Sequence, residues 1–106
     1  MSVADFLLQG EANAISTKLL VEMTGARSAR QLRNIIERER LNGTLILSTV
    51  RNGGGYFLPS EGAEGKAEIN AFVRTVHARA VNSLAILKSA RQALQEIDGQ
   101  QSLEGV

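Results

Sequence analysis

The sequence contains no cysteine, no tryptophan, a single proline and a single histidine among its 106 residues. Because cysteine is absent, disulfide bonds, thiolate zinc sites and cysteine nucleophiles are excluded, which is typical of proteins of a reducing compartment. The histidine, His77, has no aspartate or glutamate within one helical turn to orient its ring. We therefore expect His77 to be an ordinary surface or seam residue and not part of a catalytic site.

Long apolar runs are also absent, and the first residues lack the basic region of a signal peptide. We therefore expect a soluble, cytoplasmic protein with no membrane partner. Residues 53–55 are three glycines, but they lack the lysine and serine or threonine of a phosphate-binding loop. One histidine and scattered carboxylates are too few to hold a metal. The sequence predicts neither an enzyme nor a bound metal or cofactor.

Positive charge is concentrated in one window, although the net charge of the chain is only +1. The window from Arg27 to Arg51 contains six arginines and two glutamates, whereas the residues from 61 onward contain five basic and six acidic residues. A local excess of positive charge is what binding to the phosphates of a nucleic acid requires. A solvated helix face rich in arginine would give the same pattern, so charge alone leaves both interpretations open.

The first half of the chain predicts a short helix in residues 3–9 and then two helices joined by a tight turn. The first of the pair begins after Ser16 as N-cap and ends at Gly25, and the second runs from Ser28 to about Leu41. Apolar residues at helical spacing give each helix a core-facing stripe. These residues are Leu19, Leu20 and Met23 in the first helix, and Leu32, Ile35, Ile36 and Leu41 in the second.

A β-hairpin is predicted directly after these helices. Residues 44–50 are apolar and β-branched, residues 51–55 contain the turn dipeptide Asn52-Gly53, and residues 56–58 form a second strand that ends at Pro59. Tyr56 is expected to pack in the strand.

This order of elements resembles the winged helix-turn-helix family, and it is also similar to small proteins carried by bacteriophages and prophages. The resemblance covers residues 15–20, 24–25, 28–33, 42–43 and 45–59. It implies that the helix beginning at Ser28 enters the major groove of DNA and that the hairpin tip touches the neighbouring backbone or minor groove. The DNA-binding residues it implies are Ser28, Arg30, Gln31, Arg33, Asn34 and Arg38 in that helix, and Arg51 and Asn52 in the wing. The basic residues Lys18 and Arg27 are expected to bind DNA as well.

Eight of these side chains have a specific expected role. Arg30, Gln31, Arg33 and Asn34 would contact base edges, because Arg pairs with guanine and Asn or Gln with adenine. The residues expected on phosphates are Lys18, Arg27, Arg38 and Arg51. Two acidic residues, Glu37 and Glu39, interrupt this basic helix. They would either repel phosphate or hold Arg33, Arg38 or Arg40 through contacts three or four residues apart.

The last third predicts a linker in residues 61–65, a long amphipathic helix in residues 66–98 and a flexible tail in residues 99–106. The helix contains no proline or glycine and would be roughly 45–50 Å long. Its apolar residues recur at alternating steps of four and three, which is the spacing of a coiled coil. Monomers rarely expose such a strip, so we predict a homodimer through this helix, the alternative being a helix folded back on its own domain. The predicted dimer contacts are Ile69, Val73, Val76, Ala80, Leu87 and Leu94.

Together, these observations predict a mainly α-helical protein with a small β-hairpin (α+β). A winged helix-turn-helix domain in residues 1–60 would precede the long helix. The predicted function is sequence-specific binding of double-stranded DNA as a dimeric transcriptional regulator. The alternatives are a scaffold that uses the winged fold for protein contacts without binding DNA, and a phage replication accessory protein.

Overall fold

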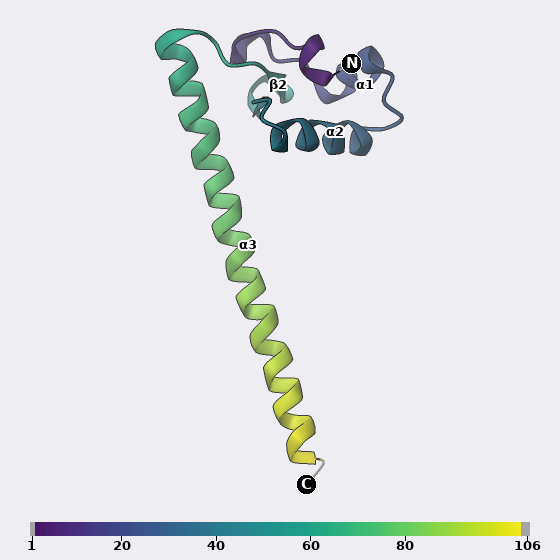
Figure 1. Cartoon of the computed structure of the whole chain (residues 1–106), viewed down its shortest axis with the longest axis vertical. Coiled ribbons are helices and arrows are strands. Elements are labelled where there is room, and N and C mark those ends of the chain that lie inside the picture. The colour runs from purple at the N-terminus through teal and green to yellow at the C-terminus, as the bar shows by residue number, and fades with distance from the viewer. Residues whose placement is uncertain (1, 105–106) are drawn as a thin grey trace. The chain divides into compact units, whose positions relative to one another are not determined.

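The computed structural model describes the backbone of residues 2–104 and the side chains of residues 2–99 (Figure 1). The chain divides into two units, one ending at Phe72 and the other beginning at Val73. The first unit contains the 3-10 helices Val3–Phe6, Glu11–Asn13 and Arg51–Gly53, helices α1 (Thr17–Thr24) and α2 (Ala29–Leu41), strands β1 (Leu47–Thr49) and β2 (Gly55–Phe57), and the first turns of α3 (Gly62–Glu104). The predicted class, mainly helical with a small hairpin, is confirmed.

Serine hydroxyls begin both α1 and α2, as the sequence predicts. The Ser16 hydroxyl oxygen accepts a hydrogen bond from the Leu19 N–H (3.2 Å), and that of Ser28 accepts one from the Gln31 N–H (3.1 Å). Each bond satisfies a backbone donor that has no partner within its helix. Gly25 ends α1 in the left-handed conformation (φ 75°), which other residues adopt at a cost. The two helices are therefore joined by a tight turn.

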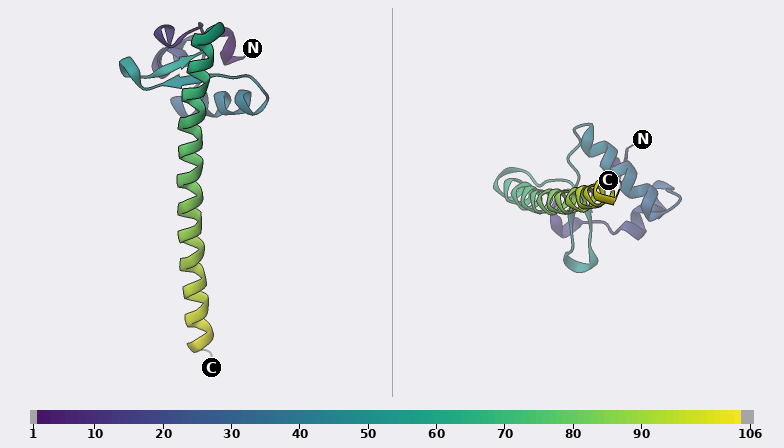
Figure 2. Two further views of the ribbon diagram at one scale, coloured as in Figure 1. Left: turned by 90° about the vertical axis from the view of Figure 1, so that its left-hand side faces the viewer. Right: turned by 90° about the horizontal axis from the view of Figure 1, so that it is seen from below.

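The hairpin pairs β1 and β2 in antiparallel register, with Leu47 opposite Phe57 and Thr49 opposite Gly55. In both views of Figure 2 the connection between these strands projects as a loop from the first unit. Ile15 adds an isolated bridge to the hairpin, because its N–H and C=O bond the backbone of Tyr56 at 2.9 Å each. This close pass requires glycine at position 55, since a Cβ there would lie 2.7 Å from the Ile15 carbonyl oxygen.

The hydrophobic core of the first unit joins the first 3-10 helix, α1, α2 and the segment leading into β1. Its buried residues are Val3, Leu7, Leu20, Leu32, Ile36 and Ile46. The predicted stripes are wrong at three positions, because Leu19, Met23 and Leu41 are exposed. Leu41 follows Leu32 by nine residues, which places it about half a turn around α2 from the buried side.

Two predicted boundaries in this unit are also wrong. Of residues 44–50 only Leu47–Thr49 form the first strand, and the second strand begins at Gly55, one residue early. Residues 11–13 form a further 3-10 helix. It begins after Gly10, whose φ of 91° favours glycine.

The predicted linker is wrong, because α3 begins at Gly62. Its first turns are attached to the N-terminal segments through Glu68. One carboxylate oxygen of Glu68 accepts the Ser60 N–H (2.7 Å), and the other accepts the Glu11 N–H (3.0 Å) and the Ser60 hydroxyl (3.3 Å). Burial raises the pKa of this carboxyl, but the hydrogen bonds outweigh that effect and the pKa lies below its ordinary value. Gly65 is buried, and a Cβ there would overlap the Ser60 carbonyl oxygen.

Helix α3 continues past Asp98 and Gly99 to Glu104. The tail predicted at residues 99–106 is therefore wrong up to Glu104, and its last two residues lie outside the described part of the chain. Every residue from Val73 to Gly99 is exposed, whereas Ile69 and Phe72 are half-buried in the first unit. None of the helices within residues 2–104 combines the length and the apolar character needed to cross a membrane.

Candidate nucleic-acid interface

One side of α2 carries four of the predicted DNA-binding residues. Arg30, Arg33, Asn34 and Arg38 are exposed and recur at steps of three and four, so they lie on one face of the helix, here called the α2 face. The opposite side holds the core residues of α2. Within the described residues, none of the four side chains forms a hydrogen bond or an ion pair. Glu37, four residues after Arg33, is exposed on the same face, so the α2 face presents three guanidinium groups, one amide and one carboxylate to solvent.

Three more predicted residues lie at the start of α2 and take part in its local structure. The Ser28 hydroxyl is the N-cap, and the Gln31 side-chain oxygen accepts the Arg27 N–H (2.6 Å). A bidentate contact of Gln31 with adenine uses both the oxygen and the nitrogen of its amide. Gln31 would have to release the Arg27 N–H to make that contact. The Arg27 side chain itself is exposed.

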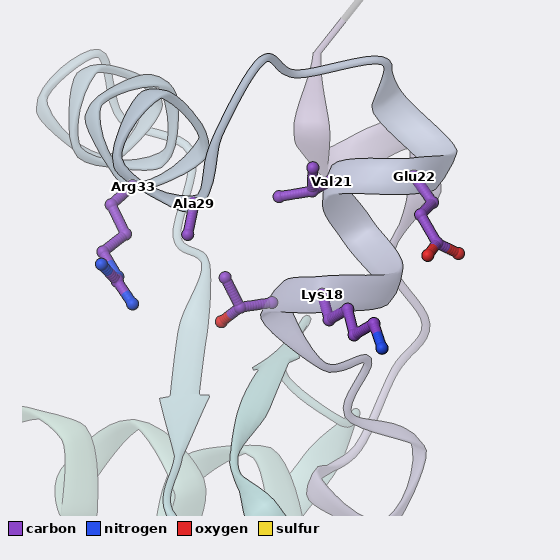
Figure 3. Close-up of a pocket in the computed structure, with 6 residues that line it drawn as sticks. Lys18, Val21, Glu22, Ala29 and Arg33 are labelled. Atoms are coloured by element: carbon purple, nitrogen blue, oxygen red, sulfur yellow. The ribbon is translucent and has the colours of Figure 1, made fainter.

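A cleft of about 440 Å³ lies between α1 and α2, and both Lys18 and Arg33 line it. Figure 3 shows Ala29 and Arg33 contributed by α2, and Lys18, Val21 and Glu22 by α1. The rim combines an ammonium group, a guanidinium group and one carboxylate around an apolar floor. The cleft is therefore lined by one positively charged residue from each helix.

The connection between the strands places the predicted wing residues at an exposed tip. Asn52 adopts a left-handed conformation (φ 52°, ψ 39°), which asparagine tolerates better than most residues. The Arg51 guanidinium forms an ion pair with the Glu11 carboxylate at 3.1 Å, with the arginine side chain 79% exposed. Arg51 therefore already has an anionic partner, although an exposed pair of this kind contributes only about 0–1 kcal/mol.

Two charged residues of the basic window point into the first unit instead of outward. The Glu39 carboxylate accepts the N–H groups of Val3 (2.8 Å) and Ala4 (3.2 Å), so it caps the first 3-10 helix. The Arg40 Nε donates to the Ile46 carbonyl at 2.7 Å, and its guanidinium lies 4.8 Å from the centre of the Phe72 ring. Within the described residues neither Glu37 nor Glu39 forms an ion pair with Arg33 or Arg38. Of the two glutamates, only Glu37 is exposed.

Sequence reasoning missed two exposed apolar residues near this surface. Leu41 at the end of α2 is 81% exposed, and Val50 before the hairpin tip is 91% exposed. The signal for Leu41 was its angular position on the helix, which differs from that of Leu32 and Ile36. Among the described side chains, no group of three or more His, Asp or Glu is placed to hold a metal ion. The exposed groups of this surface are hydrogen-bond donors, positive charges, the Glu37 carboxylate and a little apolar surface.

No protein-family model matches this sequence, and no curated protein or solved structure matches it either.

Proposed function

We propose that the protein is a winged helix-turn-helix protein that binds double-stranded DNA in a sequence-specific manner and regulates transcription in the cytoplasm as a homodimer. The observation that carries the proposal is the α2 face. It presents Arg30, Arg33, Asn34 and Arg38 to solvent without partners inside the described chain. These residues lie on the second helix of a pair joined by a tight turn, and a β-hairpin follows.

The side chains of the α2 face match what the major groove offers. A guanidinium group donates two hydrogen bonds to guanine O6 and N7, and an asparagine amide pairs with adenine N6 and N7. In this proposal Arg30, Arg33 and Asn34 contact bases. Lys18, Arg27 and Arg38 contact phosphates, where sequence does not matter. The major groove is wide enough to admit an α-helix such as α2.

The hairpin is proposed as the wing, with a weaker part in binding. Arg51 must exchange the Glu11 carboxylate for a phosphate, and that exchange offsets part of what the new contact supplies. Asn52 at the tip can donate to a phosphate oxygen without such an exchange. We expect Arg51→Ala to weaken binding less than Arg38→Ala does.

The homodimer is proposed to form through α3. Val73, Val76, Ala80, Leu87 and Leu94 lie at coiled-coil spacing and are exposed in the single chain. Their burial against a second helix would remove apolar surface from water at roughly 25 cal/mol per Å². Ile69 contributes less than predicted, because it is already half-buried in the first unit. A two-fold dimer presents two α2 faces to two half-sites.

The experiment is fluorescence anisotropy of the protein with pooled random duplexes over a salt series, followed by sequencing of the bound fraction. We expect affinity to fall steeply with salt and an inverted repeat to be enriched. Lys88→Ala, which removes one positive charge from α3, is the matched control for Lys18→Ala. Failure to bind at low ionic strength would contradict the proposal.

A second candidate function is a scaffold that binds protein instead of DNA. It is favoured by the exposed Leu41 at the end of α2 and by the Glu37 carboxylate on the exposed side of the same helix. Affinity capture with the wild-type protein and with Leu41→Ser distinguishes the two functions. A protein that loses its partner on this substitution, and that binds no duplex, would be a scaffold.

A further inference from the structure

Helix α3 carries an apolar stripe that the single chain leaves uncovered. From Val73 to Ile97 its members follow one another at alternating steps of three and four residues. They are Val73, Val76, Ala80, Ser83, Leu87, Ala90, Leu94 and Ile97, and every one of them is exposed. The larger side chains at the two ends, Val73, Leu94 and Ile97, are 56%, 62% and 51% exposed. A stripe with this spacing fits a second helix that has the same spacing.

We propose that a second copy of this chain covers the stripe in the antiparallel direction. The register is the one that pairs Val73 with Ile97 of the second copy and Ala80 with Ala90 of the second copy. In this register all eight members of the stripe have a partner, and the two-fold axis passes near residue 85. This inference rests on the homodimer of the proposed function and adds the relative direction of its two α3 helices.

The residues beside the stripe favour the antiparallel direction. Leu84 and Ile86 flank the stripe on its two sides and are 65% and 70% exposed. In an antiparallel pair, flanking residues of the same side meet across the axis, so Leu84 meets Leu84 and Ile86 meets Ile86. A parallel pair would instead set Leu84 beside Arg79, and Ile86 beside Arg91. Only the antiparallel pair covers these apolar side chains with apolar partners.

Side-chain size within the stripe points in the same direction. A parallel pair places identical residues opposite each other, so Ala80, Ser83 and Ala90 would each face a copy of themselves and leave space between the helices. In the antiparallel register Ala80 and Ala90 still face a small residue, but Ser83 faces Leu87, and the leucine fills the space beside the small serine. Close packing of this kind recovers dispersion contacts that a gap would lose.

Charge along α3 is also complementary only in the antiparallel direction. Four basic residues and no acidic residue occupy positions 74–91, whereas Glu96 and Asp98 lie at the end of the stripe. An antiparallel pair brings this acidic end beside Arg74 and Arg79 of the second copy, and a parallel pair aligns like charges. An unfavourable neighbour in this register is Arg91 beside His77 of the second copy.

Single-cysteine variants test the direction, because the natural chain has no cysteine. In the antiparallel register, the two cysteines of an Ala80→Cys dimer lie about 15 Å apart along the helix axis, which is too far for a disulfide. The cysteine of Ala80→Cys instead lies opposite that of Ala90→Cys on the second copy. We expect an equimolar mixture of the two variants to give a disulfide-linked dimer on mild oxidation, and each variant alone to remain uncrosslinked. Ala85→Cys, on the outer side of α3, is the matched control and is not expected to crosslink.

Other outcomes separate failure of the direction from failure of the dimer. Crosslinking of Ala80→Cys with itself would show a parallel pair and overturn this inference while leaving the dimer intact. A dimer by sedimentation with no crosslink in any mixture would show that the stripe is not the interface. A monomer at tens of micromolar would overturn both the inference and the proposed homodimer, and the duplex-binding experiment would still report on the α2 face independently.

Discussion

The two units of this chain use the same residue types in opposite ways. In the first unit, leucine and isoleucine are buried in a core, and several charged residues hold backbone groups in place. Leu32 and Ile36 are 0% and 1% exposed there, whereas Leu84 and Ile86 in the second unit are 65% and 70% exposed. An apolar residue therefore contributes to folding in the first unit, and in the second it is available to a partner.

The arginines of α2 show the same contrast within one helix. Arg33 is exposed and has no partner within the described residues, whereas Arg40, seven residues later, donates to the Ile46 carbonyl and lies over Phe72. The two arginines are seven residues apart, so they lie at nearly the same angle around α2. Only Arg40 reaches Ile46, just before β1, and Phe72 of α3. A count of arginines in a window therefore overstates the charge that is available to DNA.

The largest expected effect concerns the core. Leu32→Ala should destabilise the first unit by about 2–5 kcal/mol, because it leaves a cavity in a packed interior. Leu84→Ala makes the same chemical change in the second unit and should change the unfolding of a dilute, monomeric sample by less than about 0.5 kcal/mol. Urea unfolding of both variants measures the difference. Equal losses in the two variants would contradict the division into a packed and an unpacked unit.

A smaller loss is expected for Arg40→Met. It keeps most of the apolar contact of the side chain but leaves the buried Ile46 carbonyl without its donor, which costs about 1–3 kcal/mol. The matched variant Arg38→Met lies on the α2 face and should stay within about 0.5 kcal/mol of the wild type. Thermal unfolding of the pair checks this prediction. An unchanged midpoint for Arg40→Met would show that its contacts do not stabilise the fold.

Replacing a glycine by alanine should lower the stability of the first unit and raise that of the second. Gly55→Ala should destabilise the first unit by about 1–3 kcal/mol, because the new Cβ meets the Ile15 carbonyl oxygen. Gly99→Ala has no atom within 4 Å of the new Cβ and should stabilise the end of α3 by up to about 1 kcal/mol. Hydrogen exchange of the amides near each site reports both effects. Slower exchange around Gly55→Ala would be inconsistent with the close pass.

The smallest expected effect is a pH dependence centred on Glu68. Its pKa is lowered on folding, so the stability it supplies is present above the ordinary value of 4.5 and is lost as the pH falls through the lower folded value. Glu68→Gln should be less stable than the wild type at neutral pH and should lose less stability on acidification. Unfolding curves from about pH 6 to 3 test this. If the stability of the wild type and of Glu68→Gln changed with pH in the same way, Glu68 would make no contribution to the pH dependence of stability.

Local sequence signals predicted the starts of α1 and α2 and the presence of a hairpin after them. Ser16, Ser28 and Gly25 act within a few residues of themselves, so their roles could be predicted from the residues around them. The glycines at 62 and 65 were misinterpreted as a linker, because their use depends on Ser60 passing close to Gly65. The types of the neighbouring residues do not indicate that Ser60 and Gly65 lie so close together.

The candidate interface was predictable in part for the same reason. Exposure of Arg30, Arg33, Asn34 and Arg38 follows from the helical periodicity of α2. The contact of Glu39 with Val3, that of Arg40 with Phe72 and the pairing of Arg51 with Glu11 depend on segments distant in sequence. Such contacts between segments far apart in the chain are set by tertiary packing, which composition and spacing do not specify.

The most direct test of the central claim is the affinity of Arg33→Ala for the duplex enriched by the wild type, measured beside Lys88→Ala at one salt concentration. We expect a loss of about 1–3 kcal/mol, roughly 5- to 150-fold, for Arg33→Ala and relaxed preference at one base pair. Lys88→Ala should bind as the wild type does. Equal affinity of Arg33→Ala, Lys88→Ala and the wild type for that duplex would contradict the assignment of the α2 face as the surface that binds DNA.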